Sequence, residues 1–137
     1  MRSHLRAGFA ALMGPAVILV LFAGTRPYGI RMTLPLTLAA YALAHVFFWP
    51  PAVATTLVGR RLRLKSMPQL VLLMGSFSAV LSLVLSIPFI YLHVTPSYSW
   101  HRAIRDALDL GVAGAGAFIL YRLLLGQAAV DNRVPGA

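Results

Sequence analysis

The chain of 137 residues contains no cysteine and no glutamate, and its acidic side chains number three. Without cysteine it has no disulfide, no thiolate metal site, no cysteine nucleophile and no lipid-modified cysteine. Charged residues make up only 11% of the chain, whereas a water-soluble domain carries about 25% to keep its surface wetted. This shortage of charge excludes an ordinary soluble domain and indicates lipid as the surrounding solvent.

Hydrophobic residues make up 59% of the chain and gather in four long runs. Peptide groups inside a bilayer have no water to bond with, so each run is expected to form a helix that bonds internally. About 20 apolar residues suffice to cross the hydrocarbon core. We therefore predict an all-α, polytopic integral membrane protein, a single domain (residues 1–137) folded as a four-transmembrane-helix antiparallel bundle. The predicted spans are about 7–24, 33–50, 68–92 and 107–126.

Two of the spans admit a second interpretation. The first follows a basic start, from Arg2 to Arg6, which is also typical of a cleavable signal peptide. The second contains Pro50 and Pro51, which remove backbone donors. We expect the second span to end or kink there, with residues 52–59 lying along the headgroup boundary.

The positive charges predict the orientation. Eight of the twelve Lys and Arg residues lie near the two ends of the chain or in the loop of residues 60–65. Because cytoplasmic segments carry the excess of these residues, both termini are expected on the cytoplasmic side. Cations confined between apolar runs favour membrane lipids over nucleic acid as the partner. The expected contacts to anionic headgroups are Arg60, Arg61, Arg63 and Lys65.

The third and fourth runs carry small residues at helical spacing. Such stripes let two helix backbones approach closely, and serines in a membrane helix can also bond to the carbonyl four residues back. Helix packing is the favoured interpretation, and a polar track for a substrate or an ion is the alternative. The stripes consist of Gly75, Ser78, Ala79, Ser82 and Ser86 in the third run, and of Ala107, Gly111, Gly114 and Ala115 in the fourth.

Asp109 and His45 are the main candidate functional residues within the spans, because ionisable groups inside a membrane are costly unless they are paired. His45 is expected to face the bundle interior and to donate to a hydroxyl or carbonyl. His93 is expected at a depth similar to that of Asp109, on the preceding helix. For the acids the favoured interpretation is structural, with each acid paired with an arginine four residues away and lying near the helix N-terminus: Asp106 with Arg102, and Asp109 with Arg105. A proton-linked or ligand-binding role for Asp109 is the alternative.

Signatures of catalysis are missing from the sequence. The four histidines and three acids show no close metal-ligand spacing such as H-x-x-x-H. His45 and His93 lie at different depths, which disfavours a haem held between them. The sequence also has no glycine-rich phosphate loop and no nucleophile elbow. We therefore expect no enzyme activity, no catalytic residue, no metal and no cofactor.

Two families are similar to this chain in general character only. Small multidrug-resistance transporters are similar in size and number of spans, but they rely on a glutamate in the first helix, and this chain has none. Bacteriophage holins are similar in size and basic character. Many of them carry a strongly basic tail, whereas the last eleven residues here hold one arginine and one aspartate.

The function expected from these features is that of a non-catalytic accessory or assembly subunit of a complex in a bacterial inner membrane. Its small-residue faces would pack against other subunits or a second copy of the chain. The alternative is a small oligomeric transporter or lipid-handling protein. That protein would use Asp109, His45 and the serine track.

Overall fold

The computed structural model describes residues 2–24, 34–93 and 96–131, and the regular structure in these ranges is entirely helical. It comprises α1 (Arg2–Gly24), α2 (Leu34–Arg61), α3 (Met67–Tyr91) and α4 (Trp100–Asp131). All four helices contain a stretch long and apolar enough to cross a membrane. For the described residues, the prediction of an all-helical protein with four helices long and apolar enough to span a membrane is confirmed.

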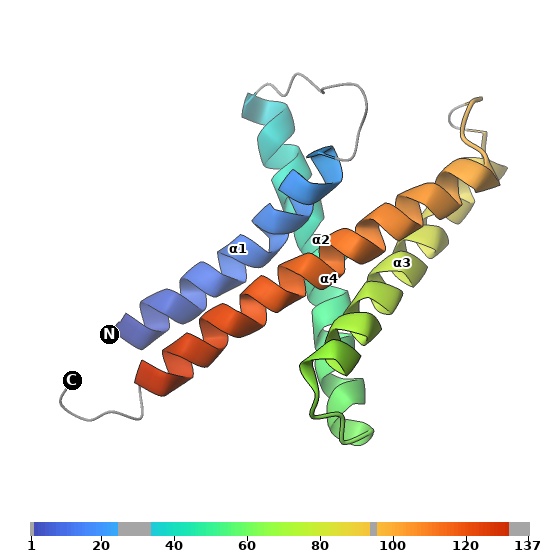
Figure 1. Cartoon of the computed structure of the whole chain (residues 1–137). Helices are drawn as coiled ribbons and strands as arrows, with labels where there is room; N and C mark the ends of the chain where they lie inside the picture. Colours follow the sequence, from blue (N-terminus) through green and yellow to red (C-terminus); the bar gives the residue numbers. More distant parts are fainter. Residues whose placement is uncertain (1, 25–33, 94–95, 132–137) are drawn as a thin grey trace.

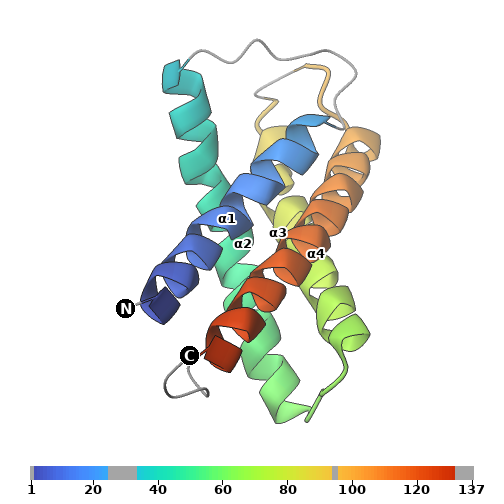
Figure 2. The same ribbon diagram turned by 60° about the vertical axis from the view of Figure 1, so that its left-hand side comes forward.

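Consecutive helices run in opposite directions, so the first turn of α1 and the last turns of α4 lie at the same end of the bundle (Figures 1 and 2). The connection between α2 and α3 lies at this end as well. Helix α4 packs along both α1 and α3, while α2 crosses behind and makes smaller contacts with them. The opposite end brings together the end of α1, the start of α2, the end of α3 and the start of α4.

Helix α2 continues through Pro50 and Pro51 to Arg61, so of the two expected outcomes, an end or a kink at the prolines, the helix end is wrong. The prolines lack an N–H, so the carbonyls four residues earlier lose their helical donors. Packing beyond the prolines compensates, because Thr55 and Gly59 are buried against α3. Prolines are tolerated in membrane helices when neighbouring helices hold the chain in this way. The expected position of residues 52–59 along the headgroup boundary stays a prediction.

Helix α4 is longer than its apolar run. It begins at Trp100, before the predicted span of residues 107–126, and it continues to Asp131. The amide of Ala103 donates to the carbonyl oxygen of Ser99, the residue just before the helix, at 2.9 Å. This bond closes the first turn. The early start places Asp106 nearly two turns inside the helix.

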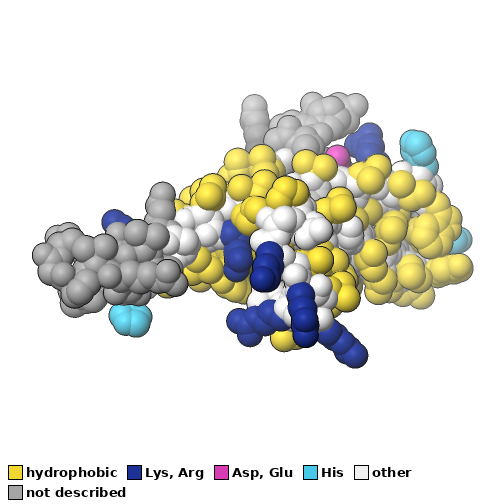
Figure 3. Space-filling view, turned by 60° about the horizontal axis from the view of Figure 1, so that its bottom comes forward, with side chains coloured by type: hydrophobic (Ala, Val, Ile, Leu, Met, Phe, Trp, Pro, Cys, Tyr) yellow, Lys and Arg dark blue, Asp and Glu magenta, His cyan; other side chains and the backbone are white. Residues whose placement is uncertain are grey.

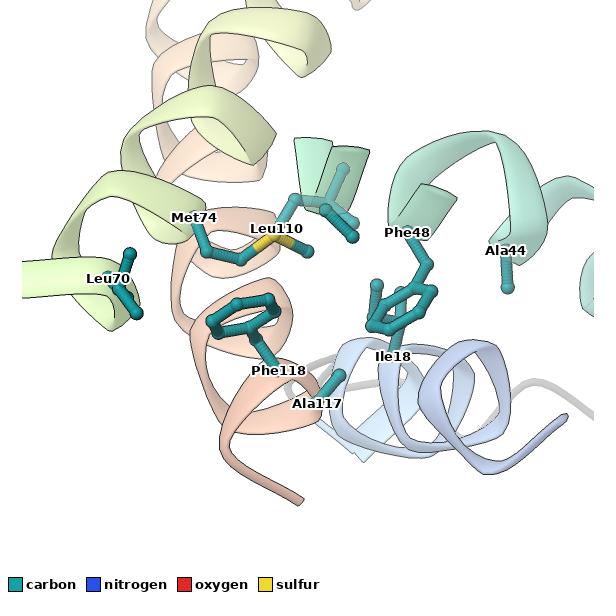
Figure 4. Packing of buried hydrophobic residues seen from close by; sticks show 9 residues of the cluster. Ile18, Ala44, Phe48, Leu70, Met74, Leu110, Ala117 and Phe118 are labelled. Carbon is teal, nitrogen blue, oxygen red and sulfur yellow. The ribbon is translucent and has the colours of Figure 1, made fainter. Parts of the chain in front are cut away.

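The core lies where the four helices cross. Figure 4 shows Phe48 of α2 pointing toward Ile18 of α1, while Met74 of α3 and Phe118 of α4 point toward each other. Phe48 fits because Gly14 of α1 has no side chain, and an added Cβ there would overlap the phenyl ring. Close packing of this kind gives the bundle one defined arrangement.

Large apolar side chains also cover the outside of the bundle. Leu72 is 73% exposed, Val112 is 74% exposed and Leu38 is 61% exposed. Patches of this extent are rare on soluble monomers. In a bilayer the same side chains meet lipid tails, which agrees with the apolar spans.

Candidate functional site

A cavity of about 390 Å³ lies between the helices in the half of the bundle where α1 ends and α2 begins. All four helices contribute to its wall. The lining residues are Ile18, Leu19 and Phe22 of α1, Ala40, Leu43, Ala44 and Phe47 of α2, Ser82, Leu85, Ser86 and Phe89 of α3, Tyr98 before α4, and Asp106 and Leu110 of α4. The wall is therefore apolar except for one group of polar side chains.

Those polar side chains form a chain of hydrogen bonds. The hydroxyl of Tyr98 donates to Oδ2 of Asp106 at 3.2 Å and lies 3.1 Å from the hydroxyl of Ser86. Each hydroxyl has one proton, so Tyr98 can accept from Ser86 while it donates to Asp106. Ser86 also lies 2.8 Å from the carbonyl of Ser82, its alternative acceptor. The chain ends at a carboxylate, which is an acceptor when ionised.

The local sequence brings these groups together. Ser82 and Ser86 are four residues apart, so they share one face of α3, and both are buried. The residues before α4 fold back so that Tyr98 reaches toward both helices, and the ring of Phe89 meets the Tyr98 ring with a centroid distance of 6.5 Å. Asp106 faces the same space from α4 and is half-buried.

Ser78, the third serine of the predicted track, lies outside the cavity lining and faces Gly114 of α4 instead. Its hydroxyl is buried and has no hydrogen-bond partner among the residues that the structure describes. One turn earlier, Gly75 faces Gly111, and a Cβ added to Gly111 would lie 3.0 Å from the carbonyl oxygen of Gly75. The two small-residue stripes therefore pack against each other along the α3–α4 contact.

Asp109 is half-buried and is not part of the cavity wall. The predicted pairing of Asp106 and Asp109 with arginines stays a prediction. Arg102 donates to the hydroxyl of Ser97 at 3.5 Å, while Asp106 accepts from Tyr98. The carboxylate that the fold brings into a shaped site is thus Asp106. The sequence gives little reason to choose Asp106, because it lies just before the apolar run of residues 107–126 and so outside the predicted span.

His45 lies on another face of α2 from the cavity-lining residues. Its Nδ1 accepts a hydrogen bond of 3.0 Å from the indole N–H of Trp49, and its ring meets Tyr41 edge-on at 4.9 Å. An indole nitrogen only donates, so Nδ1 carries no proton here, and the expected donation to a hydroxyl or carbonyl is not among the described contacts. Tyr41 in turn donates to the carbonyl of Leu12 in α1 at 2.9 Å. His45 thus belongs to the α1–α2 packing.

His93 follows the end of α3 and is exposed. It has a φ of 49°, in the left-handed region that often closes a helix. Its Nδ1 lies 2.8 Å from the carbonyl oxygen of Ile90, which only accepts, so this nitrogen carries the proton. His93 therefore caps α3 and lies outside the cavity lining.

The described residues contain no group of three His, Cys, Asp or Glu side chains that could hold a metal ion. The chain matches no protein-family model, no curated protein and no solved structure. The chemistry of the site is therefore argued from the cavity itself. An apolar wall with one carboxylate suits a molecule that is mostly apolar and carries a single donor or cationic group.

Proposed function

We propose that this chain is a non-catalytic, multi-pass membrane protein that binds an amphipathic molecule within its helix bundle. The ligand is a lipid or lipid-soluble compound with a hydroxyl or ammonium group. This proposal develops the lipid-handling alternative from the sequence, with Asp106 in the role first given to Asp109.

The observation that carries the proposal is the four-helix cavity with Asp106 at its polar end. Its volume of about 390 Å³ lies within the usual range of small-molecule sites, which are largely apolar with a few convergent polar groups. A carboxylate in an apolar setting is stabilised by a donor or a cation. Tyr98 supplies one donor, and the proposed ligand supplies another.

We place the protein in a bacterial inner membrane with both ends of the chain in the cytoplasm. This orientation is supported by the arginines and the lysine near the α2–α3 connection, at the same end as the start of α1 and the last turns of α4. The cavity then lies in the outer half of the bilayer. An accessory role in a larger complex remains a prediction, since the exposed apolar side chains suit lipid tails as well as a partner helix.

The test uses photoactivatable long-chain probes with the protein in lipid nanodiscs. Three probes share one alkyl chain and end in an amine, an alcohol or a carboxylic acid. We expect the amine and the alcohol to label peptides of α2 and α3 more strongly than the acid, because the Asp106 carboxylate repels an anion. Equal labelling by all three probes would contradict the proposed polar selectivity.

Two neighbouring alanines of α2 provide a matched pair of variants. Ala40 lines the cavity, whereas Ala39 is exposed and does not. Ala40→Phe should fill part of the cavity and reduce labelling several-fold, while Ala39→Phe should leave labelling unchanged. If both variants label like the wild type, the probes bind elsewhere and the cavity has no such role.

A further inference from the structure

The end of α2 is closed by a residue in an unusual conformation. Arg63 has a φ of 55°, in the left-handed region. Its amide donates to the carbonyl of Arg60 at 3.2 Å, and the amide of Leu64 donates to the carbonyl of Gly59 at 2.8 Å. These two bonds form a Schellman motif, in which the left-handed position is usually glycine. An arginine at this position strains the backbone, and such strain is often kept where the side chain has a function.

That side chain helps to line a second pocket, of about 320 Å³, at the end of the molecule opposite the first cavity. Three more cations line it: Arg60, Lys65 and, from α4, Arg122. Leu70 and Phe118 add apolar surface to the same wall. Figure 3 shows Lys and Arg side chains gathered on this end of the molecule. The pocket thus joins residues about 60 positions apart in the sequence.

The charges of the pocket are unbalanced. None of its described lining residues is acidic, whereas four of them are basic. Like charges held together repel, and the repulsion is relieved when an anion binds between them. Arginines bind phosphate oxygens through paired N–H groups.

We propose that this pocket binds the phosphate group of an anionic membrane lipid. The pocket lies where α2 and α4 leave their apolar spans, the level at which headgroups meet a membrane protein. Leu70 and Phe118 offer surface to the apolar part of a lipid, which a free phosphate lacks. The site shares no residue with the first cavity, so either proposal can fail without the other.

One arginine of the same cluster provides a matched control. Arg61 is exposed and adjoins Arg60, but it does not line the pocket. A bound phosphate should therefore depend on Arg63 and Arg122 and be nearly indifferent to Arg61. If the lipid were held only by a diffuse positive surface, loss of any one of the three arginines would weaken binding to a similar extent.

The experiment titrates the purified protein in detergent with three probes and counts bound adducts by native mass spectrometry. The probes are phosphatidylglycerol, phosphatidylcholine with the same acyl chains, and inorganic phosphate. We expect phosphatidylglycerol to bind at least tenfold more tightly than phosphatidylcholine. Arg122→Gln should weaken that binding about tenfold, in line with the loss of a hydrogen bond between charged groups, and Arg61→Gln less than threefold.

Arg63→Gly is a second variant that tests the same pocket even if Arg122→Gln folds poorly. Glycine adopts the left-handed conformation freely, so this variant should fold at least as well as the wild type. It should still lose about tenfold in affinity for phosphatidylglycerol. Equal losses in Arg61→Gln and Arg63→Gly, or equal binding of the two lipids, would overturn the proposal. Displacement of phosphatidylglycerol by an equal concentration of inorganic phosphate would show that the pocket binds free phosphate and would contradict a lipid as its ligand.

Discussion

Gly75 of α3 and Gly111 of α4 face each other so closely that a Cβ added to either would lie 3.0 to 3.1 Å from the carbonyl oxygen of the other. The contact is reciprocal and involves backbone atoms, which cannot rotate away as a side chain can. Since apolar side chains give no preference for one another over lipid tails, close backbone packing of this kind stabilises helix association in a membrane. The α3–α4 contact is therefore sensitive to a single methyl group.

Gly111→Ala should destabilise the bundle. The new methyl group would also lie 3.3 Å from the Cβ of Ala79, so the helices must separate, and overpacking of this kind costs roughly 1–3 kcal/mol. The measurement is the midpoint of unfolding in a detergent titration followed by circular dichroism. Gly126→Ala in the same helix is the control, because nothing lies within 4 Å of its added Cβ. A midpoint for Gly111→Ala at or above that of Gly126→Ala would refute the close approach.

Ser78 and Gly114 should behave as an exchangeable pair. A Cβ at Gly114 would overlap the hydroxyl of Ser78 and lie 2.9 Å from its Cβ, so Gly114→Ala alone is expected to unfold more easily. The double variant Ser78→Gly with Gly114→Ala removes the obstruction, and the next nearest atom is then Cε of Met74 at 3.9 Å. We expect a coupling free energy of about 1 kcal/mol or more in a double-mutant cycle. Additive effects would show that the two residues do not meet.

The sequence predicts the four spans well, because a bilayer forces long uncharged runs into helices whatever their details. It predicts their ends poorly. Pro50 and Pro51 look like a helix end on local grounds, but burial of Thr55 and Gly59 beyond them holds α2 together. Contacts between helices determine where α2 ends, and these contacts cannot be read from composition alone.

The site was harder to predict for a similar reason. Asp109 was singled out because it lies inside the apolar run, yet the helix begins at Trp100 and the residues before it bring Tyr98 onto Asp106. The serines of α3 were placed correctly on one face, but their division between packing at Ser78 and the cavity at Ser82 and Ser86 depends on where α4 crosses α3. Arg122 lies far from the basic loop in sequence, so its place in the second pocket also needed the fold.

The two aspartates of α4 should differ in their effect on ligand binding. Asp106→Asn removes the charge but keeps an acceptor for Tyr98, so we expect labelling by the long-chain amine probe to fall about tenfold and labelling by the alcohol to change much less. Asp109→Asn should leave both unchanged, since Asp109 does not line the cavity. The readout is quantitative peptide labelling at equal folded fraction. A larger loss in Asp109→Asn than in Asp106→Asn would return the role to Asp109.

The hydrogen bonds of His45 and His93 predict opposite tautomers for these two side chains. Trp49 donates to Nδ1 of His45, so a neutral His45 carries its proton on Nε2. His93 places Nδ1 against the carbonyl of Ile90, so a neutral His93 carries its proton on Nδ1. The ¹⁵N chemical shifts of labelled histidine at alkaline pH distinguish these forms, because all imidazoles are then neutral.

Trp49→Phe tests the origin of the His45 tautomer. The variant removes the donor while keeping an aromatic ring, so the ¹⁵N signals of His45 should shift toward a mixture of both tautomers, and the bundle should lose about 0.5–1.5 kcal/mol. Trp100→Phe is the matched control, because Trp100 lies at the start of α4 and packs against Tyr91 instead. A proton found on Nδ1 of His45 in the wild-type protein would contradict the observed bond, since an indole N–H cannot donate to a nitrogen that already carries hydrogen.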